Sequence, residues 1–389
     1  MLLPSTICSL KSLESIYLWR CSKFDKLPRD LGNITSLKEL GLSKTAIKEL
    51  PSSIEFLIGL TSLDLTDCKN FVLLPSTVCN LKSLEIMCLF ICPKFVNLPG
   101  NFGNLKHLEL LNFEGTAIEV LPSVRRLAAL KILILKDCKN LVCLPSTICN
   151  LKRVQYLDLT GCSKIANLLE NLGNMESLTH LLLGGTAIKE LPFSTIHLKW
   201  VYIVSFKVCQ LSSSSLTSMP TITSAGLIDL SDCNLSAIPS GVDCRTGILC
   251  DLSLRGNDFV FLPESISQFS GLKRLYLDGC KSLRSLSNIR IPSKVDLICV
   301  NNCTSLERLP ERPEPPNDFY WLSSAFYNKE FTVQCFNCFK LAYNIQNFSN
   351  MFQVFLSLSN LYVCFLNITY LGNYANILQV SISVSVCVL

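Results

Sequence analysis

The sequence predicts an α/β solenoid, in which short repeats stack so that their strands form a parallel β-sheet on a concave face. Short helical or irregular segments are expected on the outside. Two observations predict this fold. Leu-Pro pairs recur along the chain, and each interval holds regularly spaced leucines followed by Cys, Thr or Asn. The array outlined by these signals covers residues 1–310 and holds about twelve units.

The Leu-Pro pairs set the length of the repeat. Their prolines stand 23 or 24 residues apart, or twice that where one unit lacks the pair. These prolines are Pro4, Pro28, Pro51, Pro75, Pro99, Pro122, Pro145, Pro192 and Pro263, and Pro239 stands at the same spacing after Ile238. This period falls in the leucine-rich-repeat range, so we expect a leucine-rich-repeat horseshoe. The prolines are expected in the outer segments, where no sheet hydrogen bond is lost.

One unit, residues 60–68, shows the pattern LxxLxLxxC. Leu63 and Leu65 are two residues apart and point to the same side of a short strand. The ninth position, Cys68, stands at a turn, where a small inward donor can satisfy backbone carbonyls. This position is filled by Cys68, Cys92, Cys138, Cys162, Cys280, Cys303, Thr45, Thr116, Thr186 and Asn257. The pattern explains much of the excess of cysteine, 21 in all, and predicts reduced thiols and a cytoplasmic location.

A longer period is superimposed on the repeat. Thr45, Thr116 and Thr186, each followed by Ala-Ile, are 71 and 70 residues apart. We therefore infer that the array grew by copying blocks of three units.

Composition excludes several classes of function. The net charge is only +5, and no run of Lys or Arg predicts nucleic-acid binding. The three histidines, His107, His180 and His197, have no partners at the spacing of a zinc site or a nucleophile. Cys335 and Cys338 form a lone CxxC, for which we expect packed thiols. We predict no enzyme, no cofactor and no metal, and we expect His180 to face the concave surface.

The ends of the array are less regular. Residues 193–224 break the pattern, residues 311–341 form a proline-rich exit and the start of a post-repeat region, and residues 342–389 form an uncharged hydrophobic tail. Residues 351–371 are long and apolar enough to span a bilayer. A membrane helix, a buried sheet-like tail and a non-native terminus all stay open. Because Pro4 already falls inside a unit, we expect the chain to be part of a longer protein.

Several stretches resemble the repeat domain of plant intracellular immune receptors, the disease resistance proteins of the Toll/interleukin-receptor, nucleotide-binding class. They are residues 228–235, 252–259, 275–280 and 302–307, and residues 336–341 resemble the entry to that class's post-repeat domain. The resemblance implies a module that senses a pathogen effector or a modified host protein and contributes to autoinhibition. Its partners would be that protein ligand and the nucleotide-binding domain of the same receptor. This sequence has no GxxxxGK[ST] loop, so nucleotide binding is assigned to none of its residues.

The concave face is the predicted partner-binding surface. Its exposed positions alternate with the strand leucines and include residue types that anchor protein interfaces. They are Tyr17, Trp19, Arg20, Phe90, Ile91, Ile134, Lys136, Tyr156, Arg274 and Tyr276. The alternative interpretation is that these side chains only pack across neighbouring strands.

Three functions are compatible with these observations. The leading prediction is the recognition module of a plant disease resistance receptor. The first alternative is a stand-alone cytosolic signalling scaffold, although such arrays favour Asn over Cys at the turn. The second is a membrane-anchored repeat receptor, for which the sequence lacks a signal peptide and cysteine-paired caps.

Overall fold

A computed structural model describes residues 3–210, 224–236, 248–310 and 331–341, and the backbone alone of residues 362–371 and 379–388. The chain divides into two compact units, Met1–Val204 and Ser205–Leu389. Both are built from short strands that follow one another in chain order, which confirms the leucine-rich-repeat solenoid. Strand β9 (Ile203–Ser205) falls at the division between the units.

The first unit holds eight further strands of three residues each. They are β1 (Ser15–Tyr17), β2 (Glu39–Gly41), β3 (Ser62–Asp64), β4 (Ile86–Cys88), β5 (Leu110–Asn112), β6 (Ile132–Ile134), β7 (Tyr156–Asp158) and β8 (His180–Leu182). Each strand pairs in parallel with the next, residue for residue, so that Leu63 stands opposite Met87 and Met87 opposite Leu111. Equivalent positions of successive repeats therefore lie side by side.

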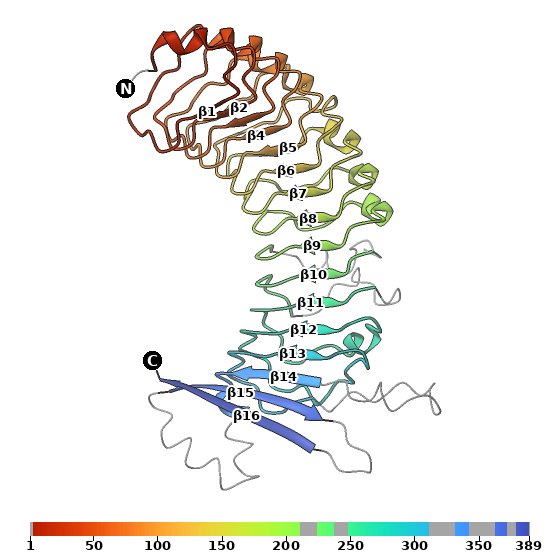
Figure 1. The fold of residues 1–389 in the computed structure, drawn as a ribbon. Coiled ribbons are helices and arrows are strands. Elements are labelled where there is room, and N and C mark those ends of the chain that lie inside the picture. Colours follow the sequence, from red (N-terminus) through yellow and green to blue (C-terminus); the bar gives the residue numbers. More distant parts are fainter. Residues whose placement is uncertain are drawn as a thin grey trace, which may run out of the picture. The chain divides into compact units, whose positions relative to one another are not determined.

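Short 3₁₀ helices lie along the side of this unit opposite the strands (Figure 1). They are η1 (Ser5–Ser9), η2 (Leu31–Asn33), η3 (Ser52–Phe56), η4 (Ser76–Asn80), η5 (Phe102–Asn104), η6 (Ser146–Asn150), η7 (Leu172–Asn174) and η8 (Phe193–His197). Pro51, Pro75 and Pro145 directly precede η3, η4 and η6, with φ near the value that the proline ring imposes. The expected outer position of the prolines is confirmed at these sites.

The second unit repeats the same plan. Its parallel strands are β10 (Leu227–Asp229), β11 (Asp251–Ser253), β12 (Arg274–Tyr276), β13 (Leu297–Cys299) and β14 (Phe331–Phe336), and η9 (Glu264–Gln268) follows Pro263. Among the described residues before position 310, strands β1–β13 make thirteen repeat strands, where the sequence predicted about twelve units. Thr332 of β14 pairs with Leu297 of β13, so the repeat sheet continues beyond residue 310.

The end of the chain contributes two longer strands. β15 (Tyr362–Leu371) pairs antiparallel with β14, and β16 (Gln379–Val388) pairs antiparallel with β15. The backbone of residues 362–371 is thus extended rather than helical, while residues 342–361 of the predicted tail lie outside the described residues. In the described part of the chain, no helix has the length and apolar character needed to cross a membrane.

The core consists of the leucines of the repeat pattern. Leu63 and Leu65 are fully buried, as are the leucines at the same positions of most other repeats. Phenylalanines also fill the interior, where Phe71, Phe95 and Phe113 follow one another with ring centroids 5.8 and 6.0 Å apart. Burial of each large apolar side chain contributes about 1.5–3 kcal/mol, so the stacked repeats stabilise one another.

The turn after most strands is held by a predicted donor. The Cys68 thiol donates to the carbonyl oxygen of Leu42, one repeat earlier, at 3.1 Å, and the Cys162 thiol donates to Leu135 at 3.0 Å. Asn257 makes more bonds, since its amide donates to the carbonyl oxygens of Leu230 and Leu254 at 2.9 Å each. The prediction of inward hydrogen-bond donors at this position is confirmed.

The residue before each donor has a left-handed backbone. Glycine fills this position at Gly115 and Gly161, with φ of 68° and 76°. Asp137 and Ile91 adopt nearly the same conformation, with φ of 57° and 59°. For a β-branched residue such as Ile91 this conformation is strained.

Candidate protein-binding surface

Each repeat presents a short row of outward side chains next to its buried strand leucine. In the β6 repeat, Leu133 is buried, whereas Lys131, Ile132, Ile134 and Lys136 are half-buried. We call these four outward positions, and their equivalents in the other repeats, the strand face. Because the strands are paired in register, each position forms a row that runs across the strands.

Two of the predicted residues form an aromatic pair at the start of the chain. The rings of Tyr17 and Trp19 lie 4.8 Å apart, and the side chains remain 51% and 57% exposed. The Tyr17 hydroxyl donates to the Glu39 carboxylate on β2. A Cβ atom at Gly41 would come within 2.8 Å of Tyr17 and 2.5 Å of Trp19, so this glycine makes room for the pair. The pair therefore packs across β2 and still presents a large exposed surface.

Three other predicted residues follow strands rather than forming part of them. Phe90 is half-buried, whereas Ile91 is 43% exposed. Arg20 and Ile91 occupy the left-handed turn position, with φ of 61° and 59°. Arg20 and Ile91 are exposed as the sequence predicted, but they lie at the turn that borders the strand face.

Ile134, Lys136 and Tyr156 lie on the adjacent β6 and β7 repeats. The Lys136 ammonium group forms an ion pair with Glu114 at 2.8 Å, and this interaction raises the pKa of Lys136. The Tyr156 ring lies 5.4 Å from the His180 ring on β8. Burial and the nearby carboxylate of Asp158 raise the pKa of Tyr156. These residues form one continuous part of the strand face.

Arg274 and Tyr276 lie on β12, in the second unit. Arg274 Nη2 donates to the Asp251 carboxylate at 2.6 Å, and the side chain of Asp251 is only 6% exposed. The Arg255 guanidinium lies 4.4 Å from the centroid of the Tyr276 ring, which is the geometry of a cation–π contact. Both predicted residues are thus held by neighbours of the preceding repeat, one on β11 and one in the segment that follows it.

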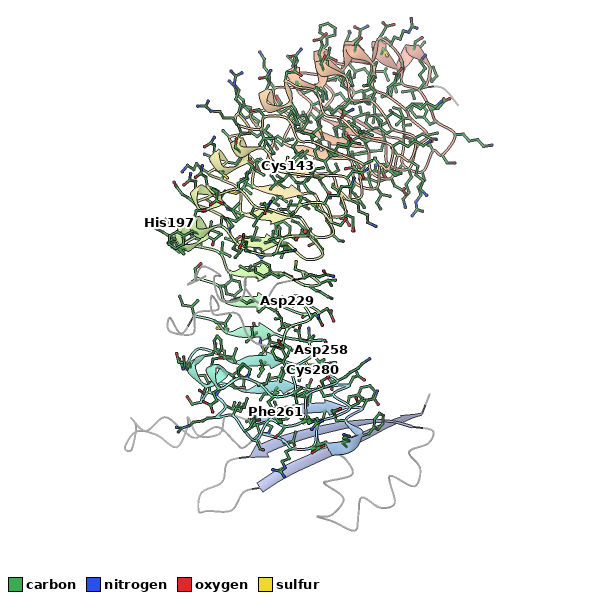
Figure 2. All side chains as sticks on the ribbon, turned by 180° about the vertical axis from the view of Figure 1, so that it is seen from behind. Cys143, His197, Asp229, Asp258, Phe261 and Cys280 are labelled. Carbon is green, nitrogen blue, oxygen red and sulfur yellow. The ribbon has the colours of Figure 1, made fainter. Side chains whose placement is uncertain are left out.

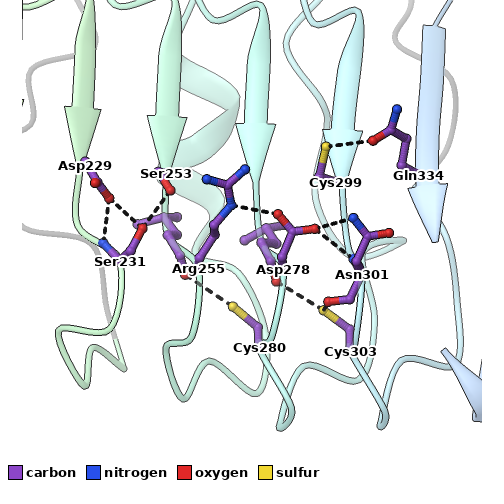
Figure 3. A network of polar contacts seen from close by, with 12 residues as sticks. Asp229, Ser231, Ser253, Arg255, Asp278, Cys280, Cys299, Asn301, Cys303 and Gln334 are labelled. Atoms are coloured by element: carbon purple, nitrogen blue, oxygen red, sulfur yellow. Dashed lines mark hydrogen bonds and ion pairs between the residues drawn. The ribbon is translucent and has the colours of Figure 1, made fainter. Parts of the chain in front are cut away.

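A network of short polar side chains continues along this part of the strand face (Figure 3). The hydroxyls of Ser231 and Ser253 lie 2.7 Å apart, and the backbone nitrogen of Ser231 donates to Asp229 at 3.0 Å. Asp278 accepts from the backbone and the side-chain nitrogen of Asn301, at 3.0 and 2.6 Å. These five residues were not among the predicted contacts because their side chains are small and polar rather than large anchor types. Their outward positions in the repeat were the signal that could have found them.

The described histidines and cysteines lie apart from one another or are packed in the repeat core. His180 lies on the strand face as predicted, with Nδ1 2.9 Å from the Thr179 hydroxyl, while His197 ends η8 on the outer side (Figure 2). Within the described residues, no group of three His, Cys, Asp or Glu side chains could hold a metal ion. The described cysteines are free thiols, and among them only Cys143 is exposed. Burial raises the pKa of the turn thiols, to about 12 for Cys162.

Comparison with known proteins shows what the repeats resemble. Residues 7–116 match the family described as "Leucine-rich repeat region". The disease resistance-like protein DSC1 of Arabidopsis thaliana is 34% identical over 194 residues, which are 48% of this chain and 15% of that protein. The TMV resistance protein N of Nicotiana glutinosa is 44% identical over 68 residues, 17% of this chain and 6% of that protein.

The repeats are thus similar to those of plant disease resistance proteins. A probable disease resistance protein of Arabidopsis thaliana extends the match of these repeats to 82% of the chain, at 29% identity over 372 residues. The chain covers 21% of that relative, so it corresponds to a small part of the length of the relatives it matches.

Solved structures share the leucine-rich-repeat fold. A leucine-rich-repeat protein of Leptospira interrogans superposes with a TM-score of 0.63 at 23% identity, over 79% of this chain and 76% of that one. The functional domain of InlJ from Listeria monocytogenes superposes with a TM-score of 0.57 at 17% identity, over 77% of this chain and 63% of that one. Its structure is described as including a cysteine ladder. At these identities the likeness establishes the fold alone.

Proposed function

We propose that this array is the protein-binding recognition module of a plant disease resistance receptor, and that it binds its ligand through the strand face. The observation that supports the proposal is the exposed aromatic and apolar character of that face in an array related to disease resistance proteins. Tyr17, Trp19 and Ile86 are 51%, 57% and 40% exposed on it. Rigid aromatic side chains with large exposed area are the usual anchors of protein interfaces.

The ligand in this proposal is a pathogen effector or a host protein altered by one. In a longer receptor of the Toll/interleukin-receptor, nucleotide-binding class, the array would also contact the nucleotide-binding domain and contribute to autoinhibition in the cytoplasm. The small share of its relatives that the chain covers is compatible with a module of a larger protein. The array acts by binding, and catalysis is assigned to none of its residues.

The proposal is tested by photo-crosslinking from two positions of the full chain. A photoreactive phenylalanine analogue replaces Tyr156 on the strand face in one variant and Phe56, on η3 and 58% exposed, in the other. After expression in challenged leaf tissue, we expect a discrete protein adduct from position 156 and none from position 56. Identical adducts from both positions, or none from either, would overturn the proposed role of the strand face.

A second measurement uses the ligand identified in this way. Trp19→Ala with Phe90→Ala removes two anchors and is expected to weaken binding while the circular dichroism spectrum stays unchanged. Binding that survives unchanged would show that the ligand is recognised elsewhere.

A further inference from the structure

An apolar row crosses the strand face of the first unit. Ile86, Leu110, Ile132 and Tyr156 stand opposite one another on β4, β5, β6 and β7. Ile86 is 40% exposed and the other three are half-buried. With about 4.8 Å between neighbouring strands, the four side chains form a ridge about 14 Å long. A contiguous exposed apolar surface of this kind marks an interaction site.

Carboxylates border this row on both sides. Glu85 and Glu109 directly precede the strand residues of the row, and Asp64 and Asp158 end their strands on its other side. Glu114 follows at the next outward position. The carboxylates are thus arranged around the apolar side chains rather than among them.

The balance of charge on this part of the face is negative. Across the strand face of the β3–β7 repeats, five carboxylates stand against two lysines, a net charge of −3 in a chain whose total is +5. Lys131 and Lys136 pair with Glu109 and Glu114, each at 2.8 Å. Glu85 and Asp64 have no ion pair within the described residues. A positively charged partner would therefore be attracted to this surface and oriented by it.

The spacing of the row favours a helix as the partner element. An α-helix lying across the strands repeats every 5.4 Å, close to the strand spacing of about 4.8 Å. An extended peptide presents same-side residues about 6.8 Å apart. Over three strand intervals the helix accumulates a mismatch of about 2 Å, against about 6 Å for the extended peptide. One side chain per helical turn can thus contact successive members of the row.

We propose that the strand face of β3–β7 binds a basic amphipathic helix of the partner protein. The inference rests on the proposed recognition function and names the chemistry of the segment recognised. Apolar residues at i, i+3/i+4 and i+7 of the helix contact Ile86, Leu110 and Ile132. Lysine or arginine residues beside the apolar stripe pair with Glu85 on one side and Asp64 on the other.

The test uses three synthetic 18-residue peptides and the full chain. The first peptide is a helix with leucines on one face and lysines on the other. The second carries glutamate in place of lysine, and the third scrambles the first so that no apolar stripe forms. Fluorescence anisotropy at 0.15 M salt is expected to show binding of the first peptide only. Equal binding of the scrambled peptide would overturn the proposal, because it would reduce the interaction to non-specific charge attraction.

Variants of the chain locate the site. Ile86→Ser with Ile132→Ser is expected to weaken binding at least ten-fold, and Glu85→Lys about three-fold or more. Glu119→Lys makes the same charge change at an exposed position off the strand face and is the matched control. Circular dichroism and the urea midpoint of each variant show that the fold is retained. Equal losses of peptide affinity for Glu85→Lys and Glu119→Lys would contradict the assigned site.

The outcome separates this inference from the proposed function. If crosslinking from position 156 captures a ligand and the lysine helix does not bind, the strand face recognises a partner of different chemistry and the present inference is wrong. If neither experiment gives a complex, the recognition function fails as well.

Discussion

The carbonyl oxygen of Leu42 accepts hydrogen bonds from Thr45, at 2.7 Å, and from Cys68 of the next repeat, at 3.1 Å. The two donors lie 3.5 Å apart. The threonine bonds within its own repeat, whereas the cysteine reaches back across the repeat boundary. The same arrangement recurs at Phe113, which accepts from Thr116 at 2.7 Å and from Cys138 at 3.1 Å. The turn cysteines therefore join neighbouring repeats to one another.

Removal of one turn thiol is expected to weaken this junction. Cys162→Ala deletes the 3.0 Å bond to the Leu135 carbonyl and leaves a small void at a fully buried position. We expect a loss of about 1–2 kcal/mol in the free energy of unfolding, measured by urea titration. Cys143→Ala alters an exposed thiol and should change the free energy of unfolding by less than about 0.5 kcal/mol. Equal effects of the two variants would contradict the role of the thiol bond.

Asn257→Ala should lower the free energy of unfolding by more than Cys162→Ala does. The Asn257 amide donates to the carbonyl oxygens of Leu230, Leu254 and Arg255. Its side-chain oxygen accepts from the backbone nitrogens of Cys233 and Leu235, at 3.1 and 2.9 Å. Alanine leaves these buried groups without partners, for which we expect a loss of about 3 kcal/mol or more. Hydrogen exchange should report faster exchange of the Cys233 and Leu235 amides. Unchanged protection of both amides would show that other groups hold this turn.

The strained turn at Ile91 offers a stabilising substitution. Ile91→Gly places at φ 59° a residue that adopts this conformation without steric cost. We expect the free energy of unfolding to rise by about 1 kcal/mol, less the small apolar contact that is lost. Ile58→Gly makes the same change at another exposed isoleucine, whose φ is not positive, and should destabilise. If Ile91→Gly destabilises as much as Ile58→Gly, the strain is not relieved.

Alkaline pH is expected to destabilise the array. Burial raises the pKa of Cys138 to about 11 and that of Cys162 to about 12, whereas an unfolded thiol titrates near about 8.5. Between these values the unfolded chain loses protons that the folded chain keeps, so stability falls as pH rises. Each thiol adds up to about 1.4 kcal/mol per pH unit to the slope.

Urea midpoints at pH 7, 8, 9 and 10 check this expectation. They should stay constant up to about pH 8 and then fall. Cys138→Thr with Cys162→Thr places at both turns the residue that Thr45 and Thr116 already use, and it should make the decline shallower. Identical pH profiles for the two proteins would assign the decline to other groups.

Much of the repeat could be predicted from the sequence because the signals are local. The LxL spacing fixed the buried side of each strand, and the ninth position identified Cys68 as an inward donor, which its bond to Leu42 confirms. Cys233 and Cys338 make the same kind of bond, to Phe206 and Val300, although neither was predicted at the turn. Their repeats have Ala225 and Cys335 where most repeats have leucine, so the pattern there is weaker.

The strand face was harder to predict because its details depend on neighbouring repeats. Nothing near Arg274 in the sequence indicates its bond to Asp251, which lies one repeat earlier. The left-handed turn at Ile91 was equally hidden, since a β-branched residue gives no signal of positive φ. Interactions between repeats are set by the stacking, which a single repeat does not encode.

The cross-repeat bonds described for the turn cysteines all end on main-chain carbonyls, a group that every residue type supplies. A unit added to or deleted from the array would therefore leave each thiol with an acceptor, whatever side chains the new neighbour brought. These bonds make no demand on the identity of the adjoining unit beyond its backbone. Gene rearrangement can therefore shuffle whole units, and with them the outward residues, without losing these bonds.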